Sequence, residues 1–127
     1  MAVETTTVSS PLVETIVQDS DADLTVETAA AAAQKLYFVE ITNSNTDEAT
    51  YVKLFAASSN SATTTQHYLQ FYCPASTTCY YYIPASVVIA NGIQFYASKE
   101  AGVQGVNSVT VSENTKTVSV KIGSTNN

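Results

Sequence analysis

The sequence predicts an all-β protein, an antiparallel β-sandwich of the jelly-roll type with about eight short strands. The first observation is that apolar and polar residues alternate at 69–73, 93–97, 109–111 and 118–122. A strand places successive side chains on opposite faces, so this period of two indicates half-buried sheets. The second is that such segments recur roughly every 8–14 residues with turn-forming residues between them, as in sandwiches.

The N-terminal third is expected to hold two short strands before a run of alanines. Residues 12–18 and 24–28 alternate weakly, and the Asp- and Ser-rich residues 19–23 between them favour a turn. Residues 29–33 are five consecutive alanines. Alanine favours helix, but five residues are too few for a stable one, so we expect either one helical turn or a tightly packed extended crossover.

The remaining strands are expected at 35–42, 50–57, 66–73, 79–84 and 93–98, with a closing hairpin made of 107–112 and 117–122. Pro84 ends its strand or places it at an edge because proline has no N–H to donate. Asn91-Gly92 is a turn signal. Alternation places Lys53 outward and directs a core set inward, namely Val52, Leu54, Leu69, Phe71, Val118, Val120 and Ile122.

The length of 127 residues is that of one domain. Residues 1–11, rich in Thr and Ser and ending at Pro11, are expected to form an extended N-terminal arm that a partner orders. Residues 12–122 form the predicted sandwich domain, and the polar residues 123–127 are expected to be a flexible tail.

The composition argues against several function classes. Charged residues make up 13% of the chain, about half of the usual 25%, while 18 Thr and 14 Ser supply a neutral, hydrogen-bonding surface. The net charge is −6 and arginine is absent, which disfavours nucleic acid and anionic membranes as partners. The N-terminus lacks the features of a secretory signal, and no apolar run is long enough to span a bilayer.

Two cysteines, Cys73 and Cys79, flank a five-residue loop. If their strands pair as a hairpin, the two thiols can face each other and form a disulfide. The alternative is a pair of reduced thiols used in packing, as in a cytosolic protein. A zinc site would need four ligands, and His67 is the single histidine.

The acidic residues Asp19, Asp21 and Asp23 are weak candidates for calcium ligands. A helix–loop–helix calcium loop needs Gly at its sixth position and Glu at its twelfth, which here are Leu24 and Ala30. The other interpretation is a solvated acidic turn, and no metal or cofactor is expected. Catalysis is not expected either, because His67 has no recognisable partners in the sequence and the nucleophile and phosphate-binding motifs are absent.

Tyrosines are concentrated between residues 68 and 82. Alternation sends Tyr80 and Tyr82 to one face, and Tyr68 and Tyr72 lie just upstream. Tyrosine is enriched at protein interfaces, so these four residues, together with Pro11, are the candidate interface. Two other interpretations are tyrosine used in place of phenylalanine for packing, and a sugar-stacking platform.

Four segments carry a resemblance to a known class of protein. They are residues 36–43, ending in Asn43; residues 51–55, Tyr-Val-Lys-Leu-Phe; residues 83–85, Ile-Pro-Ala; and residues 91–95, Asn-Gly-Ile-Gln-Phe. Together they resemble small β-sandwich structural proteins of tailed bacteriophages.

The resemblance implies a non-enzymatic virion protein, and within that class we expect a capsid decoration, or cement, protein. Such a protein is made in the host cytoplasm, binds the major capsid protein on the outer surface of the head and stabilises it. It is expected to be a homo-oligomer, with a trimer favoured. The alternatives are another virion component, such as a tail, head-fibre or adaptor subunit, and a carbohydrate-binding module.

Overall fold

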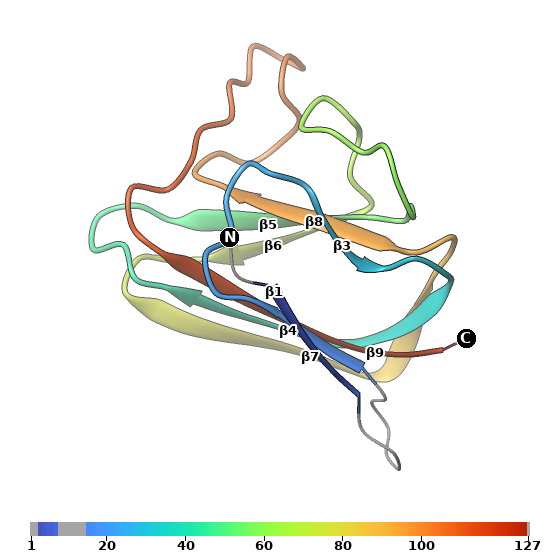
Figure 1. Ribbon diagram of the computed structural model, residues 1–127. Coiled ribbons are helices and arrows are strands. Elements are labelled where there is room, and N and C mark those ends of the chain that lie inside the picture. Colours follow the sequence, from blue (N-terminus) through green and yellow to red (C-terminus); the bar gives the residue numbers. More distant parts are fainter. Residues whose placement is uncertain (1–2, 8–14, 127) are drawn as a thin grey trace.

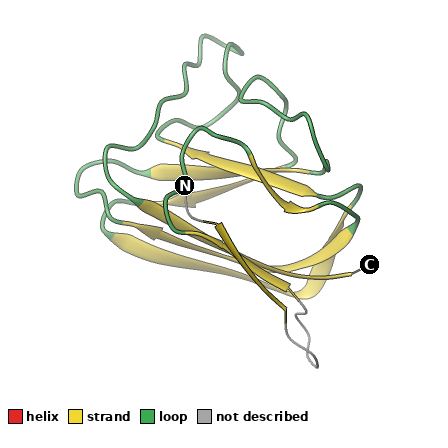
Figure 2. Cartoon of the chain, viewed as in Figure 1, coloured by secondary structure: helices red, strands yellow, loops and turns green. Residues whose placement is uncertain are grey.

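The computed structural model describes residues 3–7 and 15–126, and within these residues the protein contains strands and loops but no helix (Figure 2). Nine strands make up two antiparallel sheets packed face to face (Figure 1). Their bounds are β1 (Val3–Thr7), β2 (Thr15–Asp19), β3 (Glu27–Ala30), β4 (Gln34–Asn43), β5 (Thr50–Phe55), β6 (Leu69–Cys73), β7 (Thr77–Ile89), β8 (Ile93–Ser98) and β9 (Val118–Asn126).

The strand order confirms the predicted jelly roll. One sheet has the order β1-β2-β9-β4-β7 and the other β3-β8-β5-β6. Without β1, the chain can be drawn as one long antiparallel hairpin that turns between β5 and β6. Its paired strands are β5:β6, β4:β7, β3:β8 and β2:β9. This hairpin is rolled up so that β4 also pairs with β9 and β5 with β8, which is the defining arrangement of a jelly roll.

The core lies between the two sheets. The inward residues predicted from the alternation all contact it: Val52, Leu54, Val118, Val120 and Ile122 are buried, and Leu69 and Phe71 pack against them. Burying a side chain of this size contributes about 1.5–3 kcal/mol. In β4 the alternation shifts because a register break between Leu36 and Phe38 turns Phe38 outward, where its ring lies over Gly123 of β9.

The first and last described segments of the chain both belong to the five-stranded sheet. Val3–Thr7, expected as part of an extended arm that a partner orders, pairs with β2 and forms the outer strand. Residues 123–126, expected as a flexible tail, extend β9 between β2 and β4. The Thr-rich composition of the N-terminal segment suits a pleated surface, and the unpaired edge of β2 offers it backbone partners. Pro11 lies outside the described residues.

Two local expectations are settled or corrected by the strand pairing. Ala29 and Ala30 end β3 opposite β8, and Ala31 and Ala32 form the bend that follows, so the alanine run is not helical. The closing hairpin was wrong, because residues 107–112 form no strand. β9 already has β2 on one side and β4 on the other, which leaves it no free edge for residues 107–112.

Two long connections, residues 56–68 and 99–117, lie over the outer side of the four-stranded sheet (Figure 1). Hydrogen bonds join them to each other and to the sheet. The Gln104 N–H donates to the Thr63 carbonyl at 3.2 Å, and the Gly102 N–H donates to the Gln70 side chain at 2.9 Å. Lys53 therefore points away from the main core, as predicted, yet it is fully buried beneath this cover.

Candidate functional site

The candidate site is the side of the sandwich formed by β6 and β7, called here the β6–β7 edge (residues 69–73 and 77–89). Each strand is the last of its sheet, and the short connection 74–76 joins them. All five basic and all eleven acidic residues of the chain lie outside residues 54–98. The edge therefore carries no charged side chain in a protein whose net charge is −6.

Two aromatic side chains close the gap between the sheets at this edge. The rings of Phe71 on β6 and Tyr81 on β7 are 5.1 Å apart between centroids. The Tyr81 hydroxyl donates a hydrogen bond to the backbone carbonyl of Tyr72. Alternation along β7 turns Tyr81 inward to make these contacts and turns its two neighbours outward.

Tyr80 and Tyr82 lie on the outer face of the five-stranded sheet, beside the edge. They are 57% and 61% exposed, and their rings are nearly parallel at 6.0 Å. The Tyr82 ring also packs on Phe38 at 6.0 Å, and its hydroxyl donates to the Glu40 carboxylate at 3.1 Å. These contacts hold the tyrosines in place while leaving much of their surface free.

Tyr68 and Tyr72 are also exposed, at 55% and 48%, but they belong to the β6 side of the molecule. The Tyr72 ring packs against Tyr51 of the neighbouring strand at 5.3 Å. β6 and β7 are in different sheets, so they are not the paired hairpin considered from the sequence. The four tyrosines consequently flank the edge from two sides of the sandwich instead of forming one face.

An exposed edge strand presents unpaired backbone N–H and C=O groups to any other strand, and proteins usually protect such edges with charges, proline or bulges. β7 carries protection only in its second half, where Pro84 and the positive φ of Ser86 (57°) accompany a register break. The first half, from Thr77 to Tyr82, has neither charge nor proline. It is an uncharged edge bordered by aromatic side chains, which suits contact with another protein.

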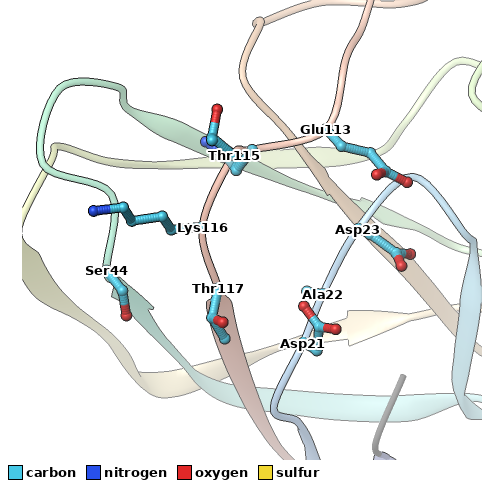
Figure 3. A pocket seen from close by; sticks show the side chains of 9 residues that line it. Asp21, Ala22, Asp23, Ser44, Glu113, Thr115, Lys116 and Thr117 are labelled. Carbon is cyan, nitrogen blue, oxygen red and sulfur yellow. The ribbon is translucent and has the colours of Figure 1, made fainter.

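The acidic turn divides between the interior and the surface. Asp19 is fully buried; its Oδ1 accepts a hydrogen bond from the Asp21 N–H at 3.0 Å, and its Oδ2 has no partner among the described residues. Asp21 and Asp23 instead line an open hollow of about 510 Å³. Glu113 adds a third carboxylate there, while Lys116 extends away from all three (Figure 3).

The weak calcium candidates are therefore not brought together as a ligand set. Over residues 3–7 and 15–126, no group of three His, Cys, Asp or Glu side chains has the arrangement of a metal site. His67 is half-buried, and its Nδ1 has no hydrogen-bond partner in the described part of the chain. Burial, followed by the charge of Lys53, lowers the pKa of His67. No carboxylate orients this imidazole through Nδ1 as a general base would need.

The pKa of Asp19 gives a testable consequence. Burial raises it from 3.8 to about 6, with the neighbouring carboxylates adding to the effect. Between these two pH values the folded protein holds a proton that the unfolded chain has lost, so this group makes the fold less stable as the pH rises through that window. Asp19→Asn is expected to remove this loss and to be more stable at pH 7 by about 2 kcal/mol.

Urea unfolding at pH 4 and pH 7 measures this prediction. The stability advantage of Asp19→Asn over the wild type should grow between the two pH values. Asp47→Asn, at an exposed bend and not among the carboxylates that act on Asp19, is the matched control and should follow the wild type. An advantage of Asp19→Asn that is the same at both pH values would show that the carboxylate is not protonated by burial.

Comparison with protein-family models, curated proteins and solved structures finds no match to this chain. In the described residues there is also no helix long and apolar enough to cross a bilayer. The geometry of the β6–β7 edge and the resemblance carried by the sequence are therefore the two indications of function.

Two features of the molecule were not identified from the sequence, for different reasons. The uncharged run from residue 54 to residue 98 is visible in the sequence, and it marks the edge without any coordinates. The burial of Lys53 and Asp19 is not visible there, because it depends on how the chain folds over these side chains and not on the local pattern of residues.

Proposed function

We propose that this protein is a non-enzymatic virion component, a capsid decoration protein that binds the outer surface of a phage head. The observation that carries the proposal is the β6–β7 edge, an uncharged strand edge flanked by four exposed tyrosines. The second support is the resemblance to phage structural proteins, which indicates that the particle is a phage. It is carried by residues 36–43, 51–55, 83–85 and 91–95. The partner is the major capsid protein, and further copies of this chain complete a homo-oligomer.

Charge explains why the contact uses this edge. A protein of net charge −6 repels further copies of itself, and the repulsion acts least where charged side chains are absent. Tyrosines contribute large apolar areas with few rotatable bonds, so little conformational entropy is lost when they are covered. Repeated over a shell, contacts of modest strength add up through avidity to a firmly bound layer.

The jelly roll supports the proposal by analogy only, since viral capsid domains and lectins both use this fold. A tail, head-fibre or adaptor subunit would use the same edge against a different virion protein. The carbohydrate-binding alternative is favoured by one observation, the pair of parallel tyrosine rings, Tyr80 and Tyr82, beside the Glu40 carboxylate. A glycan array with the purified protein tests that alternative directly.

The proposal is tested by adding the purified protein to phage heads assembled without it. Tyr72→Lys places a charge on the contact edge opposite the uncharged Tyr51, and we expect it to weaken binding at least about tenfold, because a buried, unpaired charge costs more than about 1.4 kcal/mol. Val106→Lys is the matched control, since Val106 is 49% exposed and belongs to the connection 99–117, outside β6 and β7. Equal head occupancy by both variants and the wild type would remove the edge from the binding surface.

A further inference from the structure

The two cysteines meet at the corner where β6 passes into β7. Cys73 ends β6 and is fully buried, whereas Cys79 lies near the start of β7 and is half-buried. Cys79 is opposite Ile41 in the β4–β7 register, and the Cys73 Sγ lies 3.6 Å from the Ile41 carbonyl oxygen. The Cys73 Sγ also lies 3.3 Å from the carbonyl oxygen of Thr77, two residues before Cys79, and Cys79 packs against the buried cluster that contains Cys73. β6 and β7, which belong to different sheets, thus bring the two cysteines of the chain close together.

We propose that Cys73 and Cys79 are a modification site that forms an intramolecular disulfide on exposure to a low-molecular-weight disulfide such as oxidised glutathione. The bond would connect the four-stranded sheet to the five-stranded sheet at the end of the β6–β7 edge. This inference does not depend on the proposed binding to phage heads, because it concerns the chain alone.

The chemistry proceeds by two exchanges. The half-buried Cys79 thiolate attacks oxidised glutathione, forms a mixed disulfide and releases one glutathione. Cys73 then loses its proton and attacks the Cys79 sulfur, which forms the Cys73–Cys79 bond and releases the second glutathione. Two protein thiols are oxidised and one glutathione disulfide is reduced to two thiols, so the electrons and protons balance.

The second exchange is expected to be the slow one. Burial, and then the contact with Cys79, raise the pKa of the Cys73 thiol well above its usual range. Only the thiolate is nucleophilic, so ring closure should quicken about tenfold for each pH unit at neutral and mildly alkaline pH. The mixed disulfide on Cys79 should consequently accumulate before the ring closes.

The bond would strengthen a weak seam of the molecule. Across this edge the described contacts between β6 and β7 include the Phe71–Tyr81 ring pair and the Tyr81–Tyr72 hydrogen bond, with no backbone ladder. A covalent link that closes a ring of this short length constrains the unfolded chain, and we expect the melting temperature to rise by several degrees.

The experiment treats the purified full chain with oxidised glutathione at pH 7, 8 and 9 and follows the intact mass with time. We expect a species carrying one glutathione, followed by a monomer that has lost the mass of two hydrogens, with closure faster at higher pH. The closed form should also melt at a higher temperature than the reduced form. Retention of the glutathione adduct at every pH, or disulfide-linked dimers on a non-reducing gel, would overturn the proposal.

Two variants separate ring closure from other effects. Cys73→Ala keeps the half-buried thiol, so it should stop at the glutathione adduct. Cys79→Ser keeps only the buried thiol and should react much more slowly than the wild type. If Cys79→Ser formed the glutathione adduct as fast as Cys73→Ala, the assignment of Cys79 as the thiol that reacts first would be wrong. Because the wild-type masses are read on unaltered protein, poor folding of a variant does not affect the main result.

Discussion

Replacement of Gly92 by alanine is expected to lower the free energy of unfolding by about 3–5 kcal/mol, because overpacking and backbone strain act at the same position. Gly92 lies between β7 and β8 with φ +135°, a conformation that residues with a side chain rarely adopt. An added Cβ would lie 2.6 Å from the Ala30 carbonyl oxygen, 3.0 Å from that of Ala57 and 3.1 Å from the Ser58 Cα. All three are backbone atoms, which cannot move aside as a flexible side chain can.

Gly105→Ala separates the two causes. Gly105 also has a positive φ, +83°, but an added Cβ would meet no described atom within 4 Å. This variant carries the backbone strain alone and should cost about 1–2 kcal/mol. Urea unfolding followed by circular dichroism measures both variants, and similar losses for the two would mean that the turn at Gly92 is not tightly enclosed.

Lys53→Met is expected to change how stability depends on pH. Lys53 is fully buried, and its Nζ donates to the Ser98 hydroxyl at 2.8 Å and to the Glu100 carbonyl at 2.7 Å. The ring of Tyr96 lies 5.1 Å from the Nζ. Burial lowers the pKa of Lys53 from 10.5 to about 8, against the opposing effect of the Glu100 charge.

The direction follows from the protons bound in each state. Between about pH 8 and pH 10.5 the folded protein has released the Lys53 proton while the unfolded chain still holds it, so the wild type gains stability as the pH rises. Methionine has nearly the same shape and no charge, and therefore lacks this gain. The wild type should improve relative to Lys53→Met by about 2–3 kcal/mol from pH 7 to pH 10.5.

Unfolding in urea at pH 7, 8.5 and 10 measures the difference. Lys121→Met is the control, because Lys121 is a partly exposed lysine paired with Glu40 at 3.9 Å on the outer sheet face. It should give the same difference from the wild type at every pH. Parallel curves for the wild type and Lys53→Met would show that the buried amine keeps its proton to high pH.

The strands could be predicted from the sequence because their burial has a period of two. Alternation assigned Val52 and Leu54 to the core and Lys53 to the opposite face, and the structure agrees. It could not predict that Lys53 is buried, because the covering comes from residues 56–68 and 99–117, and the alternation within β5 carries no information about where those residues pack. Alternation describes a strand's two faces and says nothing of what covers them.

Strand pairing was harder to predict than strand position. The segment 107–112 alternates like a strand, but the edges of β9 are filled by β2 and β4. Hydrogen bonds from loop side chains hold the segment instead: the Glu100 carboxylate accepts from the Ser112 N–H at 2.7 Å, and the Gln104 side chain accepts from the Val111 N–H at 2.8 Å. The alternation of apolar and polar residues within one segment does not show which sheet edges are already paired with other strands.

The tyrosines of the candidate site could be selected from the sequence, but their arrangement in space could not. Tyr68, Tyr72, Tyr80 and Tyr82 were selected because of their type and spacing, and all four are exposed. Their division between two sides of the sandwich follows from β6 and β7 joining different sheets, which is a property of the jelly roll as a whole.

The central claim is that this chain decorates a phage head, and the copy number of the chain in purified particles tests it most directly. Quantitative mass spectrometry, calibrated against the major capsid protein, gives that number. The account predicts hundreds of copies per particle, all retained on heads from which the tails have been removed. A few copies that leave with the tails would assign the chain to the tail, and purified particles without the chain would contradict the account.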